Sequence, residues 1–99
     1  MTQLEKDIEQ KLVKKVKAAG GLCLKWVCPG WAGVPDRIVL LPFGRVVFVE
    51  LKRSKSETLR KRQEWWAKKL TDLGFNYWTV NDEFSLGLFE YAELRRTEP

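Results

Sequence analysis

The sequence predicts an α/β fold: a central mixed four-stranded sheet flanked by helices, with the elements in the order α-β-β-β-α-β-α. Two segments have apolar residues at helical spacing, and four short runs are rich in β-branched and aromatic residues. The second helical segment separates the last of these runs from the first three. A crossover helix allows the strands on either side of it to be parallel, so the sheet is expected to be mixed.

The first helix has one apolar face. Its members recur at four-residue spacing: Leu4, Ile8, Leu12 and Val16. Thr2 and Glu5 have the spacing of a capping box, so we expect the helix to begin near Leu4. Gly20 and Gly21 end it.

Three strands are predicted to follow, at residues 22–27, 36–41 and 46–52. The stretch 28–35 has two glycines and two prolines, which indicates a loop. Residues 42–45, Pro-Phe-Gly-Arg, form a turn between two apolar runs. The second and third strands are therefore expected to be an antiparallel hairpin.

The second half of the chain is predicted to hold a helix, a strand and a last helix. In the first of these helices, one face of the helix carries Leu59, Gln63, Trp66, Leu70 and Leu73. The helix ends at Gly74. Residues 75–80 form the fourth strand, parallel to the third. Asn81 or Asp82 caps a last helix through Phe84, Leu88 and Tyr91.

Composition limits the chemistry of this chain. Its 99 residues predict one domain over residues 1–99. The net charge of +5 favours a polyanionic partner. Histidine is absent from the sequence, which excludes Ser-His-Asp and Cys-His catalysis and His-ligated zinc. Acid–base chemistry must then fall to Asp, Glu, Lys or Tyr.

The sequence also predicts the cellular compartment. Cys23 and Cys28 are too few for the disulfide framework of a small secreted domain, so we expect reduced thiols. The charged N-terminal segment lacks the apolar run of a signal peptide, and no stretch approaches the roughly 18 apolar residues of a membrane helix. We expect a soluble, cytoplasmic protein without membrane contact.

The hairpin brings two acids and a lysine toward one end of the sheet. Asp36 opens the second strand, while Glu50 and Lys52 project from the same face of the third. Two carboxylates and a main-chain carbonyl, such as that of Leu51, suit Mg²⁺ or Mn²⁺. The lysine can orient or deprotonate an attacking water, or offset charge on a scissile phosphate. The alternative interpretation is a Glu50–Lys52 ion pair on the surface.

Gln63 is a polar residue on the stripe of the second helix that must face the sheet. A buried amide needs a hydrogen-bond partner. It either bonds a nearby backbone group or reaches the metal–water shell near Lys52.

These motifs occur in an order that carries a resemblance. They are Gly33-Val-Pro-Asp-Arg37, Phe48-Val-Glu-Leu-Lys52 and Gln63, preceded by a helix with Ile8-Glu9 and the Gly20-Gly21 stop. Together they resemble the VRR-NUC domain of the PD-(D/E)xK nuclease superfamily, over about residues 4–81. The resemblance implies a restriction-endonuclease-like fold and a Mg²⁺-dependent phosphodiesterase that acts on DNA. Its small stand-alone members occur chiefly in phages and bacteria.

The resemblance also implies roles for single residues. Asp36 and Glu50 resemble the metal-binding carboxylates, Lys52 the catalytic lysine, and Gln63 the glutamine on the following helix. Either Glu5 or Glu9 resembles the superfamily's acid on the first helix. We prefer Glu9, because Glu5 already has a structural role in the capping box, although Glu9 could also lie on a solvated helix face.

Basic and aromatic residues are concentrated in the same part of the chain. The candidates for DNA contact are Lys25, Trp31, Arg37, Arg53, Lys55, Arg60, Lys61 and Arg62. The basic side chains could track a phosphate backbone, and Trp31 or Trp65 could stack on a distorted base. Alternatively, the charges form a solvated helix face and the tryptophans pack in a core or dimer interface.

We therefore expect a Mg²⁺- or Mn²⁺-dependent DNA endonuclease, selective for branched DNA such as four-way junctions. Two symmetric nicks require two sites, so we expect a homodimer. Aromatic residues in excess of a small core, including Trp65, Phe84, Phe89 and Tyr91, predict an exposed partner surface. The alternatives are a catalytically silent DNA-binding module and a nuclease subunit that depends on a helicase or recognition partner.

Overall fold

The central sheet of the protein has four strands. The computed structural model describes residues 3–52 and 60–96, with residues 3–5 described by their backbone alone. The strands are β1 (Leu22–Lys25), β2 (Arg37–Leu41), β3 (Arg45–Leu51) and β4 (Asn76–Val80), in the spatial order β1-β2-β3-β4. The β1–β2 and β2–β3 pairs are antiparallel, and β3–β4 is parallel. The predicted mixed sheet is confirmed.

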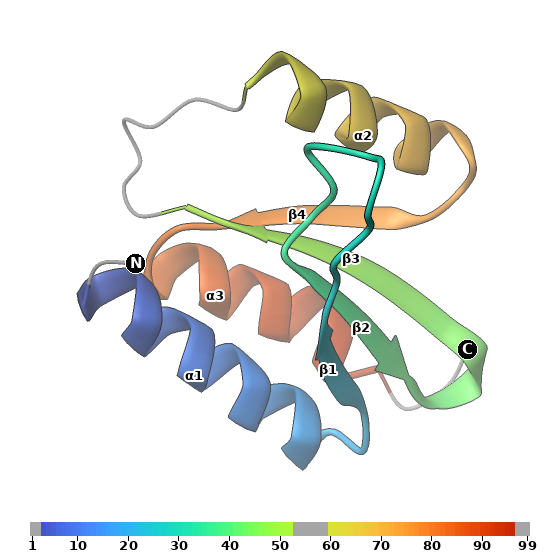
Figure 1. Ribbon diagram of the computed structural model, residues 1–99. Coiled ribbons are helices and arrows are strands. Elements are labelled where there is room, and N and C mark those ends of the chain that lie inside the picture. The colour runs from blue at the N-terminus through green and yellow to red at the C-terminus, as the bar shows by residue number, and fades with distance from the viewer. Residues whose placement is uncertain (1–2, 53–59, 97–99) are drawn as a thin grey trace.

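Helices cover both faces of this sheet. They are α1 (Gln3–Ala18), α2 (Lys61–Asp72) and α3 (Glu83–Phe89), which a π-helical turn over Glu90–Leu94 extends. Helices α1 and α3 lie on one face, and α2 lies alone on the other (Figure 1). The turn between β2 and β3 is a short 3₁₀ segment, Pro42–Gly44. None of the described helices is both long and apolar enough to cross a membrane.

The aliphatic core lies between the sheet and the α1–α3 layer. The sheet contributes Val39, Leu41, Val47, Val49, Leu51 and Val80, and the helices contribute Ile8, Leu12, Val16, Leu86 and Phe89. Alternation along β3 sends Val47, Val49 and Leu51 into this core and sends Phe48 and Glu50 to the α2 face. The two faces of the sheet therefore differ in chemistry. The α1–α3 face holds the mainly aliphatic core together with the Arg37–Glu9 and Arg45–Glu93 pairs, and the α2 face carries Phe48 and Glu50.

Element ends differ from the sequence-based expectation by a few residues. The first strand ends at Lys25 and the second begins at Arg37, although the Trp26 N–H still donates to the Asp36 carbonyl. Pro35 has no N–H to extend the ladder. The predicted start of the second helix at Leu59 lies outside the described residues, and the last predicted stripe residue, Leu73, is exposed beyond the end of α2.

The last helix forms as expected, but one residue of the predicted exposed patch is misplaced. The Asp82 side chain caps α3 by accepting from the Ser85 N–H. Phe84 and Tyr91 are exposed, whereas Phe89 is fully buried. The prediction for Phe89 was wrong because the segment turns Leu86, Phe89 and Glu93 toward the sheet.

Both cysteines are free thiols. Burial raises the pKa of Cys23 to about 11, and neighbouring Arg37 only partly offsets that effect. A thiol with this pKa stays protonated near neutral pH, which makes it a poor nucleophile and metal ligand.

Candidate active site

The end of the β2–β3 hairpin gathers two carboxylates. Arg37 pairs with Val49 in the ladder, which sets the preceding residue, Asp36, beside the end of β3. The Asp36 Oδ2 accepts from the Leu51 N–H at 2.8 Å, so a backbone bond orients this exposed side chain. Asp36 lies close enough to Glu50 for its charge to influence the ionisation of Glu50.

Glu50 is buried, with 3% of its surface exposed. Its Oε2 accepts from Gln63 Nε2 at 2.6 Å and lies 3.4 Å from Lys52 Nζ. Its Oε1 is buried without a hydrogen-bond partner among the described residues. Burial, and then the charge of Asp36, raise the pKa of Glu50 to about 7, while Lys52 acts in the opposite direction. The site thus holds more negative charge than its lysine compensates.

Gln63 connects the sheet to α2 through both ends of its amide. The amide Nε2 donates to Glu50, and Oε1 accepts from Lys52 Nζ at 2.9 Å. The same Oε1 accepts from the Arg60 N–H at 2.9 Å, which satisfies a free backbone donor at the start of α2. A glutamate here would place a third carboxylate against Glu50. An amide is the group that can donate to the acid and accept from the lysine.

Tyr77 is a candidate functional residue that the sequence analysis missed. It pairs with Phe48 across the β3–β4 ladder, so its ring lies on the face that also carries Glu50. Its hydroxyl is buried without a hydrogen-bond partner among the described residues. Burial and the charges of Glu50 and Asp36 raise the pKa of Tyr77. The sequence did contain a signal for Tyr77, because it places this hydroxyl in a strand predicted to be parallel to the strand that carries Glu50.

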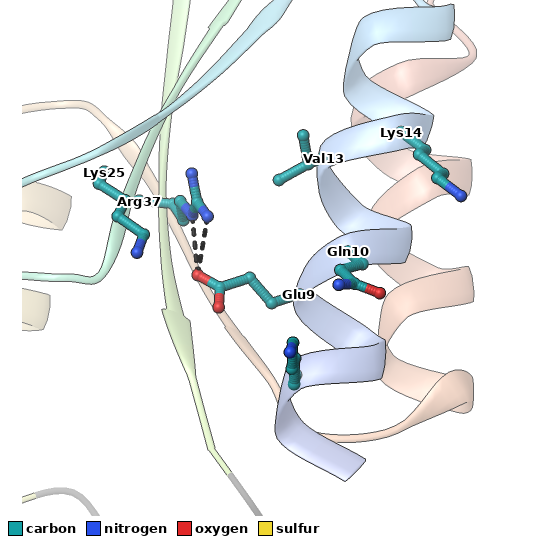
Figure 2. Close-up of a pocket in the computed structure, with 7 residues that line it drawn as sticks. Glu9, Gln10, Val13, Lys14, Lys25 and Arg37 are labelled. Carbon is teal, nitrogen blue, oxygen red and sulfur yellow. Dashed lines mark hydrogen bonds and ion pairs between the residues drawn. The ribbon is translucent and has the colours of Figure 1, made fainter. Parts of the chain in front are cut away.

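Glu9, the preferred acid of the first helix, is held by Arg37. Its Oε2 accepts from Arg37 Nε at 2.9 Å and lies 2.9 Å from Nη2 (Figure 2). Arg37 Nη1 donates to the Cys23 carbonyl. The pair borders a cavity of about 550 Å³, lined by Lys6, Glu9, Gln10, Val13, Lys14, Lys25 and Arg37. Glu9 neutralises one of the cations of this basic cavity. The side chain of Glu5, the alternative acid, lies outside the described residues.

The donor set at Asp36 and Glu50 fits one divalent cation. Two carboxylates lie together, and one buried oxygen has no proton donor among the described residues. A hard cation would satisfy that oxygen and offset the excess negative charge. Within residues 3–52 and 60–96, however, no three His, Cys, Asp or Glu side chains cluster as a metal site. The role of Glu9 as the acid of the first helix stays a prediction. The Leu51 carbonyl stays a predicted ligand.

The candidate DNA contacts lie on several elements. Arg60, Lys61 and Arg62 are exposed at the start of α2, Lys25 is exposed at the end of β1, and Trp31 is exposed in the following loop. Arg37 is half-buried in its pair with Glu9. Arg53 and Lys55 lie outside the described residues.

A solved VRR_NUC domain superposes on this structure with a TM-score of 0.87, covering 93% of this chain and 99% of that one. The chain has the VRR_NUC fold. The two sequences are 24% identical. The resemblance identified from the ordered motifs is confirmed at the level of the fold, as is the predicted mixed four-stranded sheet flanked by helices.

A curated phage protein shares closer sequence similarity over part of the chain. The "Putative nuclease p44" of Acyrthosiphon pisum secondary endosymbiont phage 1 is 52% identical over 48 residues, which are 48% of this chain. The matched segment spans about half, 52%, of that relative's length. No family model matches the sequence.

Proposed function

We propose that the protein is a nuclease that hydrolyses phosphodiester bonds in DNA with the help of Mg²⁺ or Mn²⁺. The observation that carries this proposal is the buried Glu50 carboxylate, which lies beside Asp36 and holds Lys52 Nζ 3.4 Å from its Oε2, while its Oε1 has no hydrogen-bond partner among the described residues. A stable fold has no need of such an oxygen, because an unsatisfied buried acceptor costs free energy. The VRR_NUC fold and the name of the phage relative support the same activity.

Each residue of the site has a distinct role in this proposal. Asp36 and Glu50 would hold the cation, which when bound supplies a Lewis acid and charge neutralisation for the phosphoryl group. Lys52 donates to non-bridging phosphate oxygens or to the attacking water, since its Nζ keeps donors beyond the one given to Gln63. Gln63 positions the side chains of Lys52 and Glu50 through its two amide hydrogen bonds.

The finer assignment is endonucleolytic cleavage of branched DNA by a homodimer. A two-fold dimer presents two sites related by the same rotation as the strands of a four-way junction. Exposed Phe84 and Tyr91 supply apolar surface for a partner. The protein would then act in the cytoplasm of a bacterium, either as a bacterial protein or as the product of an infecting phage.

Cleavage of labelled duplex, single-stranded, flap and four-way-junction DNA, in Mg²⁺, Mn²⁺ or EDTA, tests the activity. We expect cleavage with either metal and none with EDTA. Asp36→Asn and Lys52→Ala should each lower the rate at least a hundredfold without changing the melting temperature. Lys68→Ala is the matched control, because it removes an exposed lysine that pairs with Asp72 on α2.

Two outcomes would contradict the assignment. If Asp36→Asn or Lys52→Ala cleaves within tenfold of the wild type, the site is elsewhere. If the wild type binds DNA but cleaves none of the substrates in either metal, the protein is a silent binding module. Light scattering at micromolar concentration tests the dimer, and a monomer that nicks one junction strand would remove the junction-resolving assignment.

A further inference from the structure

Three tryptophans form an open box beside the candidate active site. Trp31 and Trp65 face each other with ring centroids 6.3 Å apart and planes inclined by 22°. Trp66 is nearly perpendicular to both, at 75° to Trp31 and 87° to Trp65, with centroids 5.8 and 5.2 Å away. Two rings therefore form walls and the third forms the floor. Trp31 is 58% and Trp65 50% exposed, which is high for rings so close together.

The box is hollow and built on rigid parts. Gly30, Trp31, Ala32, Arg62, Trp65 and Trp66 line a cavity of about 320 Å³. The floor is fixed, because Trp66 Nε1 donates to the Ala32 carbonyl at 3.1 Å and its ring packs edge-on against Trp26. The loop is seated on α2 at Gly33, whose φ is +84° and where a Cβ would lie 2.7 Å from Arg62 Cβ.

The two walls can receive a planar ring once they separate. Stacked bases rise about 3.4 Å per layer, so a base between two aromatic walls needs ring planes roughly twice that distance apart. The wall centroids lie 6.3 Å apart, which is typical of two aromatic rings in contact, so the rings must move to admit a base. A small opening of the exposed Trp31 and Trp65 rings would admit one base, which could then stack on both.

Charge identifies the class of ligand. A tryptophan cage also suits a quaternary ammonium ion. Here Arg62 lies on the cavity wall, and Lys61 precedes it on the same helix. These cations repel a cationic ligand and attract the phosphates on either side of a base. Trp66 lies three residues after Gln63, so about one helical turn separates the floor of the box from the catalytic amide.

We propose that this box, formed by Trp31, Trp65 and Trp66, binds one unpaired nucleobase of the DNA substrate next to the cleaved phosphate. The inference rests on the proposed nuclease function, since it assumes that DNA is the ligand. It adds a substrate class, because only a base that is already unstacked can enter without the cost of breaking a base pair. Bulges, gaps, mismatches and branch points supply such bases.

Fluorescence of 2-aminopurine tests the box without cleavage. A duplex with 2-aminopurine as a single-nucleotide bulge is titrated with protein in EDTA, alongside a fully paired duplex and a bulge with an abasic residue. We expect the wild type to quench the bulged probe and to bind it about tenfold more tightly than the abasic bulge. Trp65→Ala and Trp31→Ala should lose that preference while keeping their affinity for the paired and abasic duplexes.

Two variants separate stacking from folding. Trp65→Phe keeps a stacking ring and should retain most of the preference. Phe43→Ala removes a 56% exposed aromatic residue from the turn between β2 and β3 and should behave as wild type. Circular dichroism melting of each variant confirms the fold.

The proposal is overturned if Trp31→Ala and Trp65→Ala bind the bulged probe within twofold of the wild type. It is also overturned if they convert a dimer into a monomer with unchanged quenching, because the box would then be an interface between two copies. These results are independent of cleavage. The nuclease assignment fails in the metal-dependent assay, whereas the base-binding assignment fails in EDTA.

Discussion

Glu50 and Glu93 are equally buried glutamates with opposite surroundings. Each is 3% exposed. Both oxygens of Glu93 have donors: Oε2 accepts from Asn76 Nδ2 at 2.9 Å and from Trp78 Nε1 at 2.8 Å, and Oε1 accepts from Arg45 Nη1 at 3.4 Å. Glu50 receives one hydrogen bond from Gln63 and a lysine at 3.4 Å on a single oxygen, while the other has no partner among the described residues.

The difference separates a carboxylate with donors on both oxygens from one with an oxygen that has no donor among the described residues. A buried charge is tolerated when a counter-charge and neutral donors give both of its oxygens hydrogen bonds, as they do for Glu93. Glu93 thereby joins the π-helical turn to β3 and β4. Glu50 is held at a cost instead, and such unmet charge is typical of a site that binds a ligand.

Exchanging each glutamate for glutamine should produce the largest effects. Glu93→Gln removes the counter-charge of Arg45 and places an amide NH₂ group, which is itself a donor, against the donors of Asn76 and Trp78. The free energy of unfolding should therefore fall by about 3 kcal/mol. Glu50→Gln should unfold no more easily than the wild type at pH 8, yet cleave DNA at least a hundredfold more slowly. Urea unfolding and the cleavage assay measure both. If Glu50→Gln proves the less stable of the two, the comparison is wrong.

The pH dependence of stability should sharpen the contrast. The pKa of Glu50 is raised from 4.5 to about 7, so the native protein binds this proton more tightly than the unfolded chain does. Its contribution to stability is therefore full below about pH 4.5 and is lost as the pH rises through about 7. In metal-free buffer, the melting temperature of Glu50→Gln should rise relative to wild type between pH 5 and pH 8. A constant difference across this range would contradict the assignment.

Tyr77→Phe tests whether the Tyr77 hydroxyl is part of the same site as Glu50. The phenol makes no hydrogen bond with the described residues, so its removal should leave stability unchanged or slightly higher. If the hydroxyl positions water or phosphate at the site, kcat should fall about tenfold with KM unchanged. A variant with wild-type kcat would make Tyr77 a packing residue.

Glu9 is expected to give the smallest effect, because it lies between the two extremes. It is 8% exposed, and Arg37 contacts one of its oxygens through two nitrogens. Glu9→Gln should lower the free energy of unfolding by about 1 kcal/mol and change the cleavage rate less than Glu50→Gln does. Glu5→Gln is the matched control and should be silent in both measurements, since glutamine can complete a capping box. A Glu9→Gln protein as inactive as Glu50→Gln would return Glu9 to the catalytic centre.

Periodicity by itself determined the framework of this protein. Four-residue spacing predicted the buried face of α1 that contains Ile8, Leu12 and Val16, and two-residue alternation separated Val47 from Phe48 on β3. The turn at residues 42–45 fixed the hairpin register, which is why Asp36 and Glu50 could be expected at one end of the sheet. Each of these features depends on neighbours a few residues apart, which is the range over which backbone geometry constrains side-chain direction.

Tertiary structure alone decided how the buried charges are satisfied. Arg37 pairs with Glu9 across the gap between β2 and α1, and Gln63 meets Glu50 only because α2 packs on that face of the sheet. The position of Tyr77 depends on the β3–β4 register, and the facing of Trp31 and Trp65 depends on a loop that docks on a helix. Ion pairs and ring contacts form between residues that are not regularly spaced in the sequence, so periodicity does not predict them. Their partners are set by packing between elements that are distant in the chain.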